Sequence, residues 1–261
     1  MTGGLFDSPK KLCRWANQEI GNFDSAISEI LSDPTYKIVP VENRLGGKLI
    51  STLLKAVIIR QPSEEVERAG YRIISDLRNA LDQAVSAASH AIGCGSPKHT
   101  NFPFADTEHD FKRRIAARNG VFRGIPVELH PKLLSFAPFL TKEDGTDGDK
   151  LLCLLNNMAN SNKHQVTLRT VILPNGIGIS KLRGFDYFAE FKQISDFEFE
   201  ILRAFPTARE GEIGLNLYVE IRALNSSPLT QKPASILFQE FHSMVEGLVF
   251  EIEQETAKLI G

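Results

Sequence analysis

The residues best suited to chemistry lie between Asp76 and Gln83, where the sequence reads Asp-Leu-Arg-Asn-Ala-Leu-Asp-Gln. Arg78 precedes Asp82 by about one helical turn, so the two side chains can pair on one face of a helix. Leucines on either side predict that this helix is buried, where an unpaired charge is costly. We therefore expect Arg78 either to hold two packed helices together or to act on a phosphate group.

A second polar face lies in the helix predicted over residues 150–164. Asn156, Asn160 and His164 recur at steps of four, and Lys163 lies beside them. Amide and imidazole groups can both donate and accept hydrogen bonds. We expect the part of this face from Asn160 to His164 to meet Arg78.

These motifs resemble those of a widespread, poorly characterised bacterial protein family. Its members carry a helix of the form L-R-x-A-L-D-H, then a T-x-F-P segment, and then a helix that ends in D-K-H before a strand. The matching stretches in this chain are 77–83, 100–103 and 162–164. A hairpin before them, and strands with a C-terminal helix after them, also match in order. The resemblance covers most of the chain and implies its fold, but it brings no established activity.

The arginine helix also resembles the Arg-plus-His motif of HEPN-type helical domains. Some of these domains are metal-independent ribonucleases, and others bind nucleotides or RNA. The resemblance implies that Arg78 stabilises a pentavalent phosphate while a histidine relays a proton at a ribose hydroxyl. Gln83 stands where that histidine is expected, and glutamine cannot relay a proton at neutral pH. Catalysis would therefore need His164 from the neighbouring helix.

Two functions of different class remain open at this point. In the first, the chain is a HEPN-like module that binds RNA or a nucleotide, with metal-independent ribonuclease ancestry and no cofactor. In the second, it is a non-catalytic accessory or interaction protein in which the same polar network is structural. The candidate residues are Arg78, Asp82 and His164 as catalytic groups, and Asn79, Asn160 and Lys163 as binding groups.

Standard catalytic and metal-binding motifs are absent from the sequence. It contains no Walker A loop, no H-E-x-x-H, no G-x-S-x-G and no G-x-G-x-x-G after a strand. His90, Cys94 and His99 come nearest to a metal cluster, but no fourth ligand stands at a standard spacing. We expect no metal site.

The elements that position these residues follow from periodicity. Apolar residues at helical spacing predict long helices over residues 9–31, 62–93, 150–164 and 233–259, and weaker patterns predict short helices over 110–119 and 126–136. Strand patterns cover residues 36–43, 48–60, 165–173, 177–182, 196–205 and 211–224. Ser8 fits the N-cap of the first helix, with Pro9 following it. The three predicted turns lie at residues 44–47, 174–178 and 206–211.

These elements predict an α+β fold in one compact unit that spans residues 1–261. The helices centred on Arg78 and Asn157 are expected to pack antiparallel, together with a largely antiparallel sheet and a long closing C-terminal helix.

Composition narrows the function classes further. The net charge of -2 and the pI near 6.3 give no global positive field for nucleic acid or an anionic membrane. The three cysteines are widely spaced and lack a C-x-x-C motif, which is typical of reduced thiols in a cytoplasmic protein. We expect no signal peptide and no membrane span, while a homodimer remains open.

Overall fold

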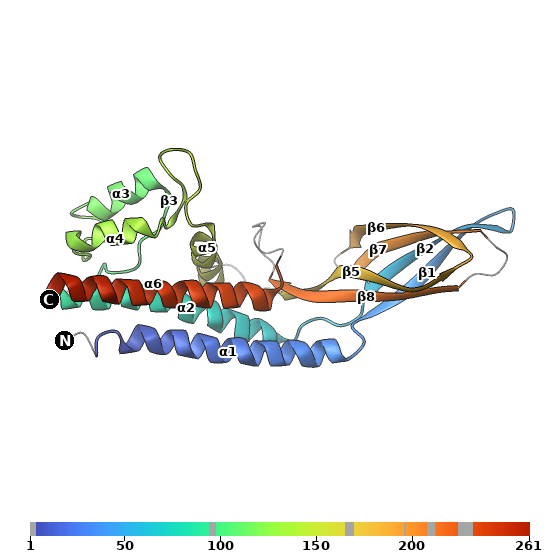
Figure 1. Cartoon of the computed structure of the whole chain (residues 1–261), viewed down its shortest axis with the longest axis horizontal. Coiled ribbons are helices and arrows are strands. Elements are labelled where there is room, and N and C mark those ends of the chain that lie inside the picture. Colours follow the sequence, from blue (N-terminus) through green and yellow to red (C-terminus); the bar gives the residue numbers. More distant parts are fainter. Residues whose placement is uncertain (1–3, 94–97, 165–169, 196, 208–211, 224–231) are drawn as a thin grey trace. The chain divides into compact units, whose positions relative to one another are not determined.

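The computed structural model describes residues 4–93, 98–164, 170–195, 197–207, 212–223 and 232–261 (Figure 1). The chain divides into two compact units. The helical unit is made of Met1–Asp24, Glu65–Arg169 and Leu224–Gly261, and the β unit is made of Ser25–Glu64 and Thr170–Ala223. The predicted α+β class is confirmed, whereas a single compact unit over residues 1–261 stays a prediction.

The helical unit contains most of the helices. They are α1 (Asp7–Ser32, which continues into the β unit), α2 (Glu64–Ala91), α3 (Glu108–Ala116), the 3-10 turn η1 (Val127–Leu129), α4 (His130–Ser135), α5 (Lys150–His164) and α6 (Ala234–Ile260). Two short strands, β3 (Ala105–Thr107) and β4 (Phe139–Thr141), pair in parallel. The predicted long C-terminal helix is confirmed, since α6 runs from Ala234 to Ile260.

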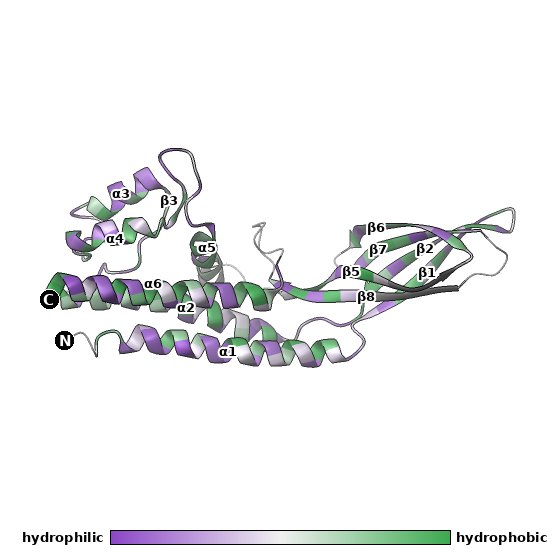
Figure 2. Ribbon diagram, viewed as in Figure 1, coloured by the Kyte–Doolittle hydropathy of each residue, from purple (hydrophilic) through white to green (hydrophobic). Residues whose placement is uncertain are grey.

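The long helices form because apolar residues recur once per turn and share one face. Figure 2 shows apolar and polar residues alternating along them. Helices α1 and α6 run antiparallel, since Lys10 Nζ lies 2.7 Å from Glu253 Oε1 at one end and the rings of Phe23 and Phe238 meet edge to face, 5.0 Å apart, nearer the other. Both phenylalanines are fully buried. This apolar contact makes the α1–α6 pair part of the core.

The start of α1 differs from the prediction. The helix begins at Asp7, so Ser8 lies inside its first turn and is not the N-cap. The Ser8 hydroxyl instead donates to Gln83 Oε1, 2.5 Å away on α2. A short-range pattern could not reveal this role, because the partner lies far along the chain.

The β unit contains the remaining strands: β1 (Tyr36–Leu45), β2 (Lys48–Ile58), β5 (Thr170–Arg183), β6 (Phe185–Ser195), β7 (Glu198–Pro206) and β8 (Glu212–Ala223). Four of them form an antiparallel sheet in the order β1-β2-β7-β6, and β5 pairs antiparallel with β8. The predicted β1–β2 hairpin is confirmed. Its turn places Gly46 at φ 58° and Gly47 at φ 81°, a left-handed conformation that glycine adopts without strain.

Two predictions about the later strands are wrong. Residues 174–178 form no turn, because β5 runs on to Arg183 with register shifts against β8. Residues 206–211 do not join a hairpin, since β7 pairs with β2 and β6 while β8 pairs with β5. In addition, no strand was expected over Phe185–Ser195, which forms β6. Local alternation identifies a strand, but only the whole sheet selects its partner.

Among the described residues, no helix combines the length and the apolar character needed to cross a membrane.

Candidate functional site

Arg78 is buried in the helical unit, with 9% of its surface exposed, and all three guanidinium nitrogens donate hydrogen bonds. Nη1 donates to Asp82 Oδ1, Nη2 to the carbonyl oxygen of Phe102 at 3.3 Å, and Nε to Asn156 Oδ1 at 3.2 Å. The guanidinium also lies 4.8 Å from the ring centre of Phe104. Arg78 therefore connects α2, α5 and the segment before β3.

Asp82 completes this connection. Its Oδ1 accepts from Arg78 and also from the backbone N–H of Phe102, 2.7 Å away. The pairing predicted for Arg78 and Asp82 is present, and it anchors residues 102–104 by hydrogen bonds to both backbone groups of Phe102. Burial of Phe102 and Phe104 against this network holds the segment in place. We call these contacts the Arg78 network.

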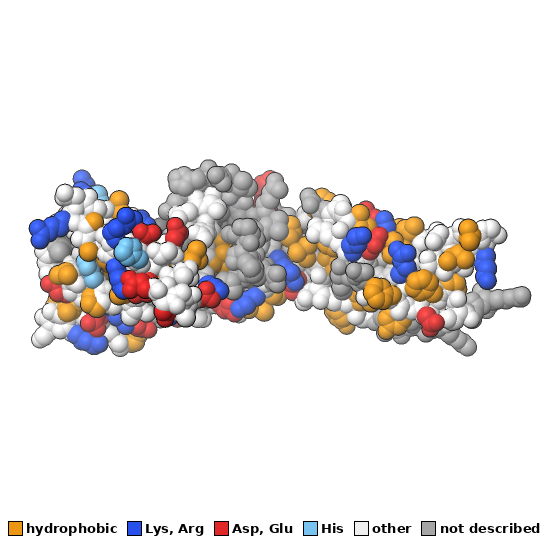
Figure 3. Space-filling model, turned by 90° about the horizontal axis from the view of Figure 1, so that it is seen from above, with side chains coloured by type: hydrophobic (Ala, Val, Ile, Leu, Met, Phe, Trp, Pro, Cys, Tyr) orange, Lys and Arg blue, Asp and Glu red, His pale blue; other side chains and the backbone are white. Residues whose placement is uncertain are grey.

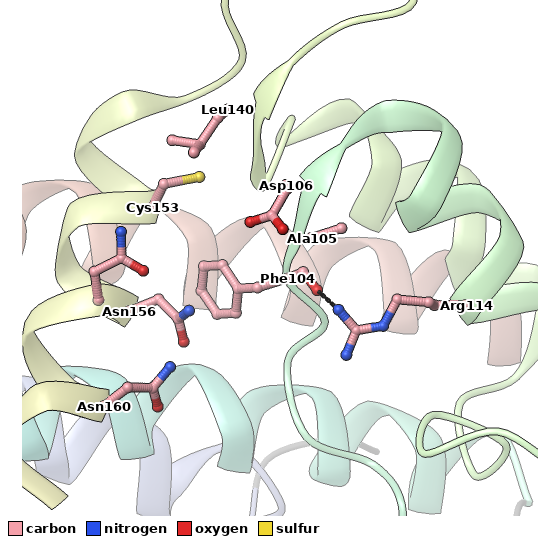
Figure 4. Close-up of a pocket in the computed structure, with 9 residues that line it drawn as sticks. Phe104, Ala105, Asp106, Arg114, Leu140, Cys153, Asn156 and Asn160 are labelled. Atoms are coloured by element: carbon pink, nitrogen blue, oxygen red, sulfur yellow. Dashed lines mark hydrogen bonds between the residues drawn. The ribbon is translucent and has the colours of Figure 1, made fainter. Parts of the chain in front are cut away.

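The described α5 side chain that meets Arg78 is that of Asn156, and not that of Asn160; the side chain of His164 lies outside the described residues. Figure 4 shows the reason: α5, in yellow-green, crosses α2, in teal, instead of running alongside it in the expected antiparallel arrangement. Because crossing helices are close at one point only, Asn156 reaches the guanidinium while Asn160 does not. Asn160 is exposed one turn farther along α5.

The other predicted site residues are placed differently. α5 ends at His164, but the side chains of Lys163 and His164 lie outside the described residues. Their assigned roles therefore stay predictions. Asn79 is exposed on α2 and is not among the residues that line the neighbouring pocket. Gln83 is also exposed, and it accepts the hydrogen bond from Ser8.

A polar pocket of about 220 Å³ opens beside the Arg78 network (Figure 4). We call it the asparagine pocket, after three of its lining residues. It is lined by Phe104, Ala105, Asp106, Arg114, Leu140, Cys153, Asn156, Asn157 and Asn160. The network thus contributes two of its own members, Phe104 and Asn156, to the wall of the pocket.

The hydrogen bond from Arg78 orients the amide of Asn156. Because the carbonyl oxygen Oδ1 accepts from Arg78, the Nδ2 group is left as a donor, and no described residue accepts from it. Asn157 and Asn160, both exposed, add two further amides to the pocket. Each amide offers a donor and an acceptor side by side.

Charged groups lie on the opposite wall. Asp106, in β3, contributes an acceptor-only carboxylate, and Arg114, in α3, contributes a planar donor group. Arg114 Nη1 donates to the Phe104 carbonyl oxygen at 2.7 Å, drawn in Figure 4, and its guanidinium lies 5.3 Å from the ring centre of Phe122. These two contacts fix the guanidinium at the edge of the pocket. The pocket wall therefore offers a ligand both hydrogen-bond donors and hydrogen-bond acceptors, neutral in the amides and charged in Asp106 and Arg114.

The start of α5 is positioned by the residues before it. Asp149 Oδ1 accepts from the backbone N–H of Leu152 at 2.8 Å, which satisfies one of the unpaired donors of the first turn. The backbone N–H of Asp149 donates to the Ala137 carbonyl oxygen at 2.8 Å. These bonds set where α5 begins, and with it the positions of Cys153 and Asn156.

The residues that the structure describes contain no group of histidine, cysteine or acidic side chains able to hold a metal ion. Of the three metal ligands considered from the sequence, Cys94 lies outside the described residues. His99 Nε2 lies 2.6 Å from Arg123 Nη2, so the ring nitrogen accepts from the guanidinium.

Both described cysteines should be unreactive in the folded protein. Burial raises the pKa of the Cys13 thiol to about 11, with a further contribution from the Glu246 carboxylate, and raises the pKa of the Cys153 thiol to about 12. At pH 8 only roughly one thiol in a thousand, or fewer, would be the reactive thiolate, and that fraction rises with pH.

A Cys94→Ser variant, which removes the third thiol, tests this expectation with a colorimetric thiol reagent. The folded variant should react slowly at pH 8, and two thiols per chain should react at once after denaturation. Rapid labelling of the folded variant would contradict the burial of both thiols.

Sequence reasoning missed most of the pocket. Arg114 falls in the short helix predicted over residues 110–119, and Asp106 and Asn157 belong to no motif. The sequence shows little sign that these three residues meet, because each belongs to a different element. The number of residues between two elements does not determine how close their side chains lie in the fold. Comparison with protein-family models, curated proteins and solved structures finds no match for this chain.

Proposed function

We propose that this chain is a non-catalytic binding module that takes the base of a nucleotide, free or in RNA, in the asparagine pocket. One observation carries the proposal: Arg78 is buried and donates a hydrogen bond from each of its three guanidinium nitrogens, while Asn156, which it orients, lines the pocket. The arginine then organises a binding wall and does not contact the ligand.

A catalytic role for Arg78 is not favoured by its contacts. A group that stabilises a pentavalent phosphate must reach the reacting atoms, whereas Arg78 is buried. Three of the five N–H groups of Arg78 already donate, to Asp82, Phe102 and Asn156. Rearranging them would leave Asp82 without its cation in a half-buried setting, which is costly.

A nucleobase suits the donors and acceptors of the pocket. Asparagine amides form paired hydrogen bonds with base edges, most characteristically with adenine. The carboxylate of Asp106 can accept from an exocyclic amino group, and Arg114 can donate to a ring or phosphate oxygen. A volume of about 220 Å³ is small for a pocket that encloses a whole ligand, and it favours a base with the sugar and phosphate outside. The buried free thiols fit the cytoplasmic location expected from the sequence.

Binding is tested by titrating the protein, in the presence of chelator, with each nucleoside monophosphate and with a short single-stranded RNA. Asn160→Leu should weaken binding by about tenfold or more, because it removes one amide from the pocket. Asn79→Leu is the matched control, since it replaces another exposed asparagine on a helix outside the pocket.

Absence of binding by the wild type, or equal losses in the two variants, would overturn the proposal. Incubation of the same RNA in chelator tests the catalytic alternative. If the RNA is cleaved, and His164→Ala abolishes cleavage without changing the melting curve, the module is a ribonuclease.

A further inference from the structure

The four-stranded sheet of the β unit has one face that is buried over the central strands β2 and β7, and an opposite face that is more exposed. Leu54, Ala56, Phe199 and Leu202 point to the buried face, and each is at most 6% exposed. On this same face the Tyr36 hydroxyl accepts from the backbone N–H of Leu217 in β8, at 3.0 Å. The β5–β8 pair therefore covers this side of the sheet.

The opposite face, which we call the outer face, carries large apolar side chains in the open. Phe188 on β6 is 61% exposed, Phe205 on β7 is 41% exposed, and Val41 on β1 is 43% exposed. Figure 3 shows hydrophobic side chains interspersed with Lys and Arg over the β unit. Isolated apolar residues are ordinary on a surface, but a connected group of them marks an interface.

The strand register shows that these residues are connected. Phe188 pairs with Arg203, Arg203 with Leu53, and Leu53 with Val41, so one row of side chains crosses all four strands. Phe205 lies two residues from Arg203 on the same strand and faces the same way. The row thus begins and ends in exposed apolar residues, with an arginine between them.

The next row along the strands is mostly charged. Lys192 pairs with Glu200, Glu200 with Lys55, and Lys55 with Val39. Asp186, which pairs with Phe205, adds a second acidic group to the outer face. Charges of both signs lie close together here, which disfavours a polyanion such as nucleic acid and suits a surface that carries the same mixture.

We propose that the outer face joins two copies of this chain into a homodimer, with their four-stranded sheets packed face to face. Such a contact is isologous, so the same residues meet from both sides. If the two-fold axis lies along the strands, the strand order reverses between the copies, and β6 of one copy faces β1 of the other. Phe188 of one copy then lies on Val41 of the other, and Glu200 of one copy faces Lys55 of the other. Apolar side chains therefore meet apolar ones, and acidic side chains meet basic ones.

The test is the molar mass of the protein by light scattering and by sedimentation over a range of concentrations. The wild type should be a dimer that dissociates on dilution. Phe188→Lys places a charge at the apolar row and should weaken the dimer by at least about tenfold, since exposed aromatic residues commonly dominate such contacts. Its melting curve should match that of the wild-type monomer, because Phe188 is largely exposed.

Phe250→Lys is the matched control, because Phe250 is also more than half exposed, at 54%, but lies on α6. It should leave the dimer unchanged. A wild type that is monomeric at every concentration would overturn the proposal, as would a dimer that survives Phe188→Lys or is lost equally in Phe250→Lys. Since the dimer is read from mass alone, this result is independent of nucleotide binding.

Discussion

Replacing Arg78 by alanine should lower the free energy of unfolding by about 3 kcal/mol or more, as expected when one partner of a buried ion pair is removed. The substitution leaves the Asp82 carboxylate without its cation, and it leaves the Phe102 carbonyl oxygen and Asn156 Oδ1 without a donor. Unpaired polar groups in the interior carry their full cost of desolvation. Equilibrium denaturation in urea measures the change.

The matched control for this change is Arg72→Ala, on the same helix. Arg72 is exposed and lies 3.4 Å from Glu19, so its loss should cost less than about 1 kcal/mol. If Arg78→Ala costs no more than Arg72→Ala, the Arg78 network is not a structural connection, and Arg78 becomes available as a catalytic group. A large difference supports a positioning role.

Gly148→Ala should be about as damaging, because the new methyl group has no space. A Cβ at this position would lie 1.9 Å from the Phe139 carbonyl oxygen, which belongs to the backbone of β4 and cannot turn aside. We expect a loss of about 3 kcal/mol, at the upper end of ordinary overpacking. The displacement would also reach Asp149, which caps α5, so nucleotide binding should fall with stability.

Gly247→Ala provides the comparison for Gly148→Ala. A Cβ at position 247 meets nothing within 4 Å, and the residue lies inside α6, where alanine is favoured over glycine by up to about 1 kcal/mol. This variant should be slightly more stable than the wild type. Thermal unfolding of the two variants, measured in parallel, checks that Gly148→Ala lowers the stability and that Gly247→Ala raises it. Equal stability of Gly148→Ala and the wild type would contradict the close approach of Gly148 to β4.

Features that depend on neighbours in the sequence were predicted well. Arg78 and Asp82 pair because residues four apart meet on any helix, and the Gly46-Gly47 turn forms because glycine adopts its left-handed conformation without strain. The α5 helix over residues 150–164 also follows directly from its periodicity. In each case the interaction involved is local, so the sequence alone carries the information.

Features that depend on distant segments required the structure. The partner of Arg78 on α5 is Asn156 and not Asn160 because two helices cross, and a crossing point cannot be read from either helix alone. The pairing of β8 with β5 likewise required the structure, because several strands share the same alternation of apolar and polar residues and the alternation does not say which of them pair.

The sequence by itself therefore determined the α+β class, the long helices and the buried arginine with its acidic partner. Only the tertiary structure decided that this arginine meets Asn156 and Phe102, and that a pocket forms beside it from residues such as Asp106 and Arg114. The physical reason is that periodicity specifies which face of an element is buried. The side chains that meet in space are set by how whole elements pack together.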